Sequence, residues 1–210
     1  MGYSLNSLCT VALLRSNGLG NFLTKSYVLK SFPQSLKKTK IVAITKPGKS
    51  GELASDYRPI ALLSVSYKVI ERLILNRIAE RANEFVPIEQ AGFRKNRSCC
   101  DQVLSLTTHI ERGFQDRQKT TTVFIDLTSA YDTVWREGMM SKFIKIFPCK
   151  QLARLLNNML ANRNIQVYQN GKTSRNYIIN NGLPQGSVLT PALFNIYTAD
   201  LPDTVSKKFI

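Results

Sequence analysis

The sequence predicts an α+β fold, in which helices and strands follow one another irregularly along the chain. Its 210 residues are 43% hydrophobic and 20% charged, which is the composition of a folded globular protein. Apolar residues recur at helical spacing in several stretches, whereas β-branched and aromatic residues run uninterrupted in shorter ones. Because the chain exceeds a typical domain of about 150 residues, it is long enough to bury a core.

The N-terminal half predicts a strand and a long helix. Residues 1–30 have weak periodicity and indicate only short helical pieces. Residues 41–45 are an apolar run typical of a strand, and the Lys-, Pro- and Gly-rich residues 46–51 predict a turn after it. Residues 67–82 place Ile70, Leu73, Ile74 and Ile78 at helical spacing, so we expect that face to be buried and the arginine-bearing side to be exposed.

A second helix and a second strand are predicted in the middle of the chain. Ser98 and Asp101 have the spacing of a helix N-cap with reciprocal hydrogen bonds, so a helix is expected to begin there. Its apolar residues fall on one face as far as Phe114. The β-branched and aromatic residues 120–125 predict a strand that ends at Asp126.

Three signals follow in the C-terminal part. Residues 152–161 predict a helix with a buried leucine and methionine face. The pair Asn170-Gly171 predicts a hairpin with a type I′ turn. Thr190 followed by Pro191 predicts a helix start, with Thr190 as the N-cap.

Charge and rare residues narrow the function. The chain holds 29 Lys and Arg against 14 Asp and Glu, a net charge of +15 that favours a polyanionic partner such as nucleic acid or an anionic membrane surface. The single histidine, His109, excludes a zinc motif with two histidines and disfavours a serine protease triad, so chemistry must rest on carboxylates. The four cysteines form no C-x-x-C pair, which favours a reduced, intracellular protein. We expect no membrane-spanning helix and no secretion signal.

Asp126 is the first candidate for a chemical role. A carboxylate at the end of an otherwise apolar strand is costly unless the ion is paired or binds a metal, and a hard cation such as Mg²⁺ would suit it. The alternative is that Asp126 only caps the turn into a helix that starts near Ser129.

Long motifs around Asp126 and near the C-terminus resemble a known family. Residues 124–135 read F-I-D-L-T-S-A-Y-D-T-V-W, and residues 182–197 read G-L-P-Q-G-S-V-L-T-P-A-L-F-N-I-Y. With K-P-G-K at 46–49, Y-R-P-I at 57–60 and A-G-F-R at 91–94, they resemble the reverse transcriptase domain of non-LTR retrotransposons, most closely the jockey-like elements, from about residue 37 to the C-terminus. Group II intron and telomerase-like reverse transcriptases are less similar to the sequence from Asn195 to Pro202.

The resemblance implies a right-hand polymerase fold, with fingers over residues 1–118 and a partial palm over 119–210. It implies RNA-directed DNA polymerisation with an RNA template, a DNA primer, dNTP and Mg²⁺ or Mn²⁺. Two-metal transfer to a primer 3′-hydroxyl needs hard oxygen ligands. An element ribonucleoprotein of this kind is expected in the cytoplasm and nucleus.

The same resemblance assigns roles to individual residues. Asp126 is implied as the catalytic carboxylate and metal ligand, with the Leu127 carbonyl as a second ligand. Tyr131 is implied to exclude a 2′-hydroxyl, with an ordinary core tyrosine as the alternative. The implied nucleotide-binding residues are Tyr131, Gln185, Gly186, Arg58, Lys46 and Lys49, and the implied template-binding residues are Arg94, Lys95 and Arg97. A solvated surface run remains the alternative for Lys46 and Lys49, and a helix-preceding turn for residues 184–186.

The sequence departs from the family pattern at its end. Reverse transcriptases carry an aromatic-Ala-Asp-Asp turn after the Leu-Pro that here is Leu201-Pro202, and this chain has no such pair before Ile210. The final acidic hairpin and the thumb are therefore expected to be missing, and we expect the isolated chain to be inactive. The competing hypothesis is a catalytically dead, nucleic-acid-binding remnant of a retrotransposon.

Overall fold

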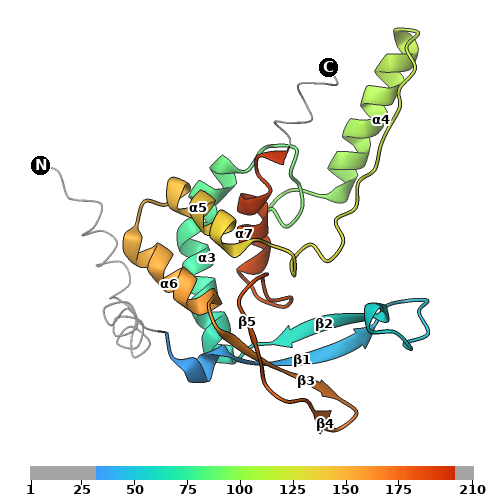
Figure 1. Ribbon diagram of the computed structural model, residues 1–210. Coiled ribbons are helices and arrows are strands. Elements are labelled where there is room, and N and C mark those ends of the chain that lie inside the picture. The colour runs from blue at the N-terminus through green and yellow to red at the C-terminus, as the bar shows by residue number, and fades with distance from the viewer. Residues whose placement is uncertain (1–31, 202–210) are drawn as a thin grey trace, which may run out of the picture.

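A computed structural model describes residues 32–201, and the short helical pieces predicted within residues 1–30 lie outside this range. The described part combines one sheet with five α-helices, as the mixed composition of its sequence predicts (Figure 1). Its elements are η1 (Gln34–Lys37), β1 (Lys38–Thr45), η2 (Ala54–Asp56), β2 (Tyr57–Leu62), α3 (Val65–Phe85), α4 (Cys99–Gln115), α5 (Arg136–Ile146), α6 (Lys150–Leu160), β3 (Arg163–Gln169), β4 (Lys172–Thr173), β5 (Tyr177–Ile179) and α7 (Thr190–Tyr197).

The sheet joins the two halves of the chain. Its order is β2-β1-β3-β4, with β5 paired to β3. β1 runs antiparallel to β2, with Ile41 opposite Ala61, and parallel to β3, with Ile41 opposite Val167. Because β1 and β3 are distant in sequence, their pairing places the β1–β2 hairpin beside segments from the C-terminal half.

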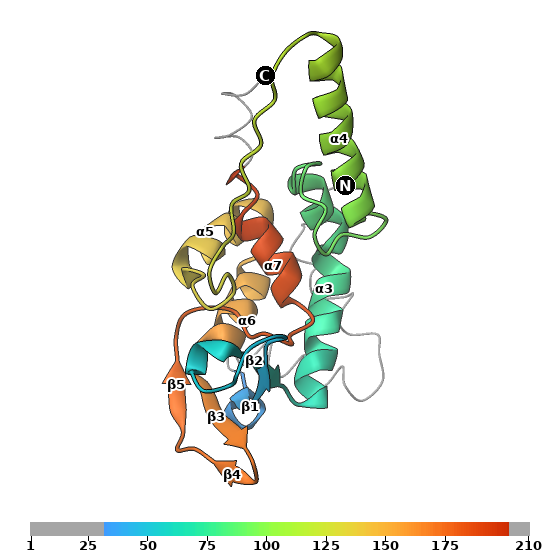
Figure 2. The same ribbon diagram turned by 90° about the vertical axis from the view of Figure 1, so that its right-hand side faces the viewer.

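The core lies between the helices above the sheet. α3, α5, α6 and α7 gather there in both views (Figures 1 and 2). Phe143 and Leu156 are fully buried in it, as are Ile78 and Ile196. The predicted buried face of α3 is confirmed at Ile70, Ile74 and Ile78, whereas Leu73 is 36% exposed because it lies at the edge of the apolar stripe.

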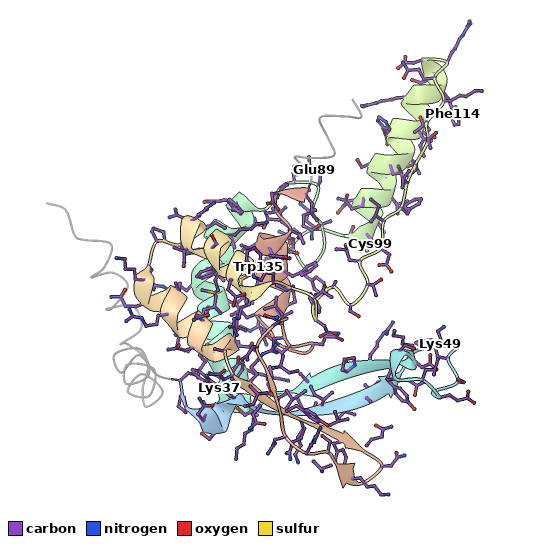
Figure 3. All side chains as sticks on the ribbon, viewed as in Figure 1. Lys37, Lys49, Glu89, Cys99, Phe114 and Trp135 are labelled. Carbon is purple, nitrogen blue, oxygen red and sulfur yellow. The ribbon has the colours of Figure 1, made fainter. Side chains whose placement is uncertain are left out.

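α4 begins where the sequence predicts but is not packed. Ser98 caps it, accepting from the Asp101 N–H while the Asp101 carboxylate accepts from the Ser98 N–H. No residue of α4 is buried, and the helix projects from the body, with Cys99 at its base and Phe114 near its far end (Figure 3). Its apolar face is therefore open in the described part of the chain.

The strand predicted over residues 120–125 is wrong. These residues form an irregular segment that returns from the far end of α4 toward α5 (Figure 1). Val123, Phe124 and Ile125 are 76%, 84% and 82% exposed. A strand needs a neighbour for its backbone hydrogen bonds, and no strand within residues 32–201 pairs with this segment. The residue types of this segment do favour strands, but local propensity does not determine whether a neighbouring strand is present to pair with it.

The remaining element predictions are close to the structure. β1 and α6 form where predicted, and Asn170 and Gly171 have φ values of 50° and 75°, as a type I′ turn requires. α7 also forms, but Leu189 rather than Thr190 occupies the N-cap, so the predicted start is one residue late. None of the helices described between residues 32 and 201 is long and apolar enough to cross a membrane.

Candidate nucleotide and nucleic-acid site

The turn at residues 184–187 is the centre of the candidate site, and it lies against β2. The Ala61 N–H donates to the Gln185 carbonyl oxygen at 2.7 Å. Gly186 follows with φ at +105°, a region that side-chain-bearing residues rarely adopt. A Cβ added there would lie 2.7 Å from the Ala61 carbonyl oxygen. Glycine is therefore required for the turn to approach the strand this closely.

The Gln185 side chain connects this turn to the segment after Asp126. Its Nε2 donates to Asp132 Oδ2 at 3.2 Å. Burial raises the pKa of the Asp132 carboxyl, and the hydrogen bond from Gln185 opposes that rise. The Leu183 N–H also donates to the Tyr131 carbonyl oxygen at 2.8 Å. The two long sequence motifs are thus in direct contact.

Tyr131 lies at the margin between this site and the core. Its ring meets the Phe194 ring edge-on, with centroids 5.2 Å apart, and is half-buried. Burial raises the pKa of its phenol. The position fits both a core residue and a residue that limits the space beside Gln185, so both interpretations from the sequence stay open.

Asp126 does not belong to a formed metal centre within residues 32–201. It lies in the irregular segment after α4 and is exposed, rather than at the end of a central strand as predicted. The helix predicted to start near Ser129 is also wrong, because residues 128–133 form turns and the next helix begins at Arg136. Within residues 32–201 no group of three His, Cys, Asp or Glu side chains could hold a metal ion. Asp200 is also engaged, because its carboxylate contacts Lys142 Nζ at 2.6 Å. The donor set around Asp126 and Leu127 therefore does not fit a pair of divalent ions.

The basic residues of the β1–β2 hairpin differ in their freedom. Lys46 Nζ donates to the Ser55 carbonyl oxygen at 2.8 Å and so closes the turn. Lys49 lies at the far end of the hairpin and is exposed (Figure 3). Arg58 is exposed on β2, three residues before Ala61. Of the three cations of this hairpin that the sequence assigned to nucleotide binding, Lys49 and Arg58 are therefore the two that an anionic ligand can reach from solvent.

The loop at residues 90–97 is held by its own arginine. The Arg94 guanidinium donates to Asn83 Oδ1 at 2.8 Å and to the Asn83 and Pro87 carbonyl oxygens at 3.0 and 2.5 Å. Lys95 and Arg97, by contrast, are exposed. Arg94 shapes the loop, and the two neighbouring cations are the ones presented to a ligand.

Asn195 fixes the same loop from the opposite side. This residue of α7 is 4% exposed. Its Nδ2 donates to the Gly92 carbonyl oxygen at 2.8 Å, and its Oδ1 accepts from Gln90 Nε2 at 3.0 Å. α7 therefore supports both the 184–187 turn before it and the basic loop.

Two buried charged residues near the turn were not predicted from the sequence. Glu71 on α3 contacts the turn directly, through Ser187 and Val188. Arg163 at the start of β3 donates to the Gly182 carbonyl oxygen at 2.9 Å, and burial lowers its pKa. For Glu71 a signal was available, because an acid interrupts the apolar stripe of residues 67–82 at a core position.

The chain has relatives among known proteins. Residues 44–210 match the family described as reverse transcriptase (RNA-dependent DNA polymerase). The chain is similar to a probable RNA-directed DNA polymerase from transposon BS of Drosophila melanogaster, with 42% identity over 173 residues, 81% of this chain and 19% of that protein. It is also similar to the RNA-directed DNA polymerase from mobile element jockey of Drosophila funebris, with 34% identity over 82% of this chain and 19% of that protein. The chain thus spans about a fifth of the length of these relatives.

Proposed function

Because the chain belongs to the reverse transcriptase (RNA-dependent DNA polymerase) family, we propose that it is part of an RNA-directed DNA polymerase of a jockey-like, non-LTR retrotransposon. The proposed reaction is transfer of a nucleotide from dNTP to a primer 3′-hydroxyl opposite an RNA template. The observation that carries the proposal is the Gln185–Asp132 hydrogen bond, which joins two family motifs across 53 residues of sequence.

Gln185 and Gly186 are proposed to border the nucleotide. The glycine lets the turn approach β2, and the Gln185 side chain is held at one end by Asp132. Tyr131, whose carbonyl oxygen accepts from the N–H of Leu183 directly before the turn, is proposed to limit the space for a 2′-hydroxyl. Arg58 lies three residue steps before Ala61 along β2, about 10 Å. That is close enough for a long guanidinium to reach a triphosphate beside Gln185.

The template is proposed to follow the basic loop. Lys95 and Arg97 are exposed there, and Arg94 keeps the loop in shape through its bonds to α3. The net charge of +15 supports a polyanionic partner. Cations on a rigid loop bind phosphates with little sequence preference.

Enzymes of this family use divalent metal ions, and Mg²⁺ or Mn²⁺ is proposed here. The described residues contribute one candidate carboxylate, Asp126, with the Leu127 carbonyl beside it, and we propose that further ligands lie outside residues 32–201. The division into fingers (1–118) and partial palm (119–210) is likewise a proposal, and the β1–β3 pairing shows that the two parts share one sheet.

A catalytically dead, nucleic-acid-binding remnant is the second candidate. The observation that favours it is the absence, within the described range, of a group of three metal-binding side chains. Both candidates predict RNA binding by the 210-residue chain. They differ only in whether a longer protein that contains this chain synthesises DNA.

Primer extension on a primed RNA separates the two candidates. We expect no product from the 210-residue chain and clear extension from a longer protein that includes the natural downstream segment. In the longer protein, Asp126→Asn should abolish extension while RNA affinity stays within about twofold of the unsubstituted protein, because one carboxylate contributes little to phosphate binding. Glu111→Gln, which alters an exposed carboxylate on α4, is the matched control and should retain full activity. RNA binding without extension by the longer protein would favour the remnant, and full activity of Asp126→Asn would reject the assigned role of Asp126.

A further inference from the structure

Glu71 is a buried acidic side chain on the face of α3 that meets the 184–187 turn. It is 2% exposed, and its neighbours along the same face are Tyr67, Ile70 and Ile74. Burial raises the pKa of its carboxyl, because removal from water disfavours the charged form. An apolar residue would fill such a position at lower cost. The reason for an acid must therefore be sought in what its oxygens contact.

Both carboxylate oxygens of Glu71 accept hydrogen bonds, one from the last residue of the turn and one from the residue that follows it. One accepts from the Ser187 hydroxyl, and the other accepts from the Val188 N–H at 3.1 Å. The Ser187 Oγ in turn accepts from the Leu189 and Thr190 N–H groups, each at 3.1 Å, at the start of α7. Glu71 thus completes a chain of hydrogen bonds that runs from α3 through the turn to α7.

The hydrogen-bond polarity shows why a carboxylate is suited to this position. Ser187 and Val188 both present donors, so their acceptor must supply two oxygens. The lone pairs of the Ser187 hydroxyl are occupied by two backbone N–H groups, so its hydrogen has to point at Glu71. A glutamine has one oxygen and one NH₂ group, so one donor of the turn would face another donor.

The turn carries Gln185 two residues before Ser187. Its position is therefore defined from two sides, by Ala61 of β2 at the Gln185 carbonyl and by Glu71 of α3 at Ser187 and Val188. We propose that Glu71 is a positioning residue that fixes the 184–187 turn and thereby holds the Gln185 side chain in its nucleotide-binding position beside Asp132. The inference rests on the proposed function for the role of Gln185, but the positioning itself can be measured without nucleotide.

Amide hydrogen exchange in the 210-residue chain measures the positioning directly. In Glu71→Gln the N–H groups of Val188, Leu189 and Thr190 should exchange at least about tenfold faster, because a charge-assisted hydrogen bond is lost. The Gln185 side-chain amide resonance should also shift toward that of a solvent-exposed glutamine. Glu84→Gln, at an exposed position on the same helix, is the matched control and should leave both signals unchanged. Unchanged protection in Glu71→Gln would overturn the proposal.

Ligand affinities distinguish positioning of the turn from general loss of structure. Glu71→Gln should weaken dNTP binding at least about tenfold while RNA affinity, which depends on the cations of the basic loop at residues 90–97, stays within about twofold. Equal losses of both affinities, or faster exchange with unchanged dNTP affinity, would overturn the proposal. If the unsubstituted chain binds no dNTP, the nucleotide role of Gln185 fails, and the positioning by Glu71 is decided by the exchange measurement alone.

Ser187→Ala provides a second route to the same link if Glu71→Gln does not fold. It removes the hydroxyl that donates to Glu71 and accepts from the start of α7. It should reproduce the exchange and dNTP effects, and the double variant should be no worse than the more affected single variant, because both substitutions break one connection. Fully additive effects would show that the two residues act separately and would overturn the proposal.

Discussion

Replacing Gly186 with alanine tests the close approach of the 184–187 turn to β2. The backbone at Gly186 has φ at +105°, and the new Cβ would lie 2.7 Å from the Ala61 carbonyl oxygen. Relieving this overlap requires the turn to move, which would break the bond from the Ala61 N–H to the Gln185 carbonyl. We therefore expect a loss of unfolding free energy well above that of an ordinary glycine substitution.

The magnitude follows from three contributions. A left-handed backbone costs a side-chain-bearing residue about 1–2 kcal/mol, overpacking against a fixed neighbour about 1–3 kcal/mol, and the lost hydrogen bond about 1 kcal/mol. Gly171→Ala is the matched control, because Gly171 has φ at +75° but no atom within 4 Å of its added Cβ. The control should cost only the backbone term, so the two variants should differ by at least about 2 kcal/mol.

Urea unfolding followed by circular dichroism measures both variants. The Gly186→Ala midpoint should fall well below that of Gly171→Ala, at an unchanged slope. Equal midpoints would refute the reasoning, because they would show that the turn does not lie against Ala61 as the structure has it. A changed slope would instead indicate an altered unfolded or native state and would call for hydrogen exchange as a separate readout.

Three further predictions concern charge. RNA binding by the chain, measured by filter binding, should weaken steeply as the salt concentration rises. The double variant Lys95→Glu, Arg97→Glu should bind RNA more weakly, and its salt slope should fall by about one for each phosphate that is no longer neutralised. Salt-independent binding would contradict the nucleic-acid assignment. Because burial raises the pKa of the Glu71 carboxyl, the folded state binds the Glu71 proton more tightly than the unfolded state does. The contribution of Glu71 to the free energy of unfolding is therefore greatest at low pH, and it declines as pH rises from the usual glutamate range through the raised pKa. Urea titrations at several pH values should show this decline flattened in Glu71→Gln. Asp200→Ala removes the ion pair between this exposed carboxylate and Lys142, whereas Lys142 keeps its hydrogen bond to the Tyr197 carbonyl oxygen, so this variant should cost less than about 1 kcal/mol in the same assay.

Local sequence signals predicted the elements that depend on local physics. Three such predictions are confirmed, because each depends only on residues close together in sequence: the N-cap pair Ser98 and Asp101, the Asn170-Gly171 turn and the apolar face of α6. The strand prediction for residues 120–125 was wrong because a strand depends on a neighbouring strand, which the local sequence pattern cannot specify.

In the candidate site, too, local features could be predicted from the sequence, whereas contacts between distant segments could not. The motifs placed Gln185 and Gly186 in one turn, but the hydrogen bond from Gln185 to Asp132 depends on how two distant segments pack. Likewise, nothing local distinguishes Arg94, which is bound to Asn83, from the exposed Arg97. Glu71 could be noticed as an acid in an apolar stripe, but its partner Ser187 lies 116 residues away.

The parallel pairing of β1 with β3 makes folding depend on the order of synthesis. Lys38 lies opposite Asn164 and Val42 opposite Tyr168, so β1 has no parallel neighbour until the ribosome has released residues near 168. During that interval the β1–β2 hairpin can form alone, and an isolated hairpin is only marginally stable in water. The open edge of β1 must therefore be kept from pairing with other nascent chains, and the exposed lysines at positions 38 and 40 provide the repulsion that delays such pairing.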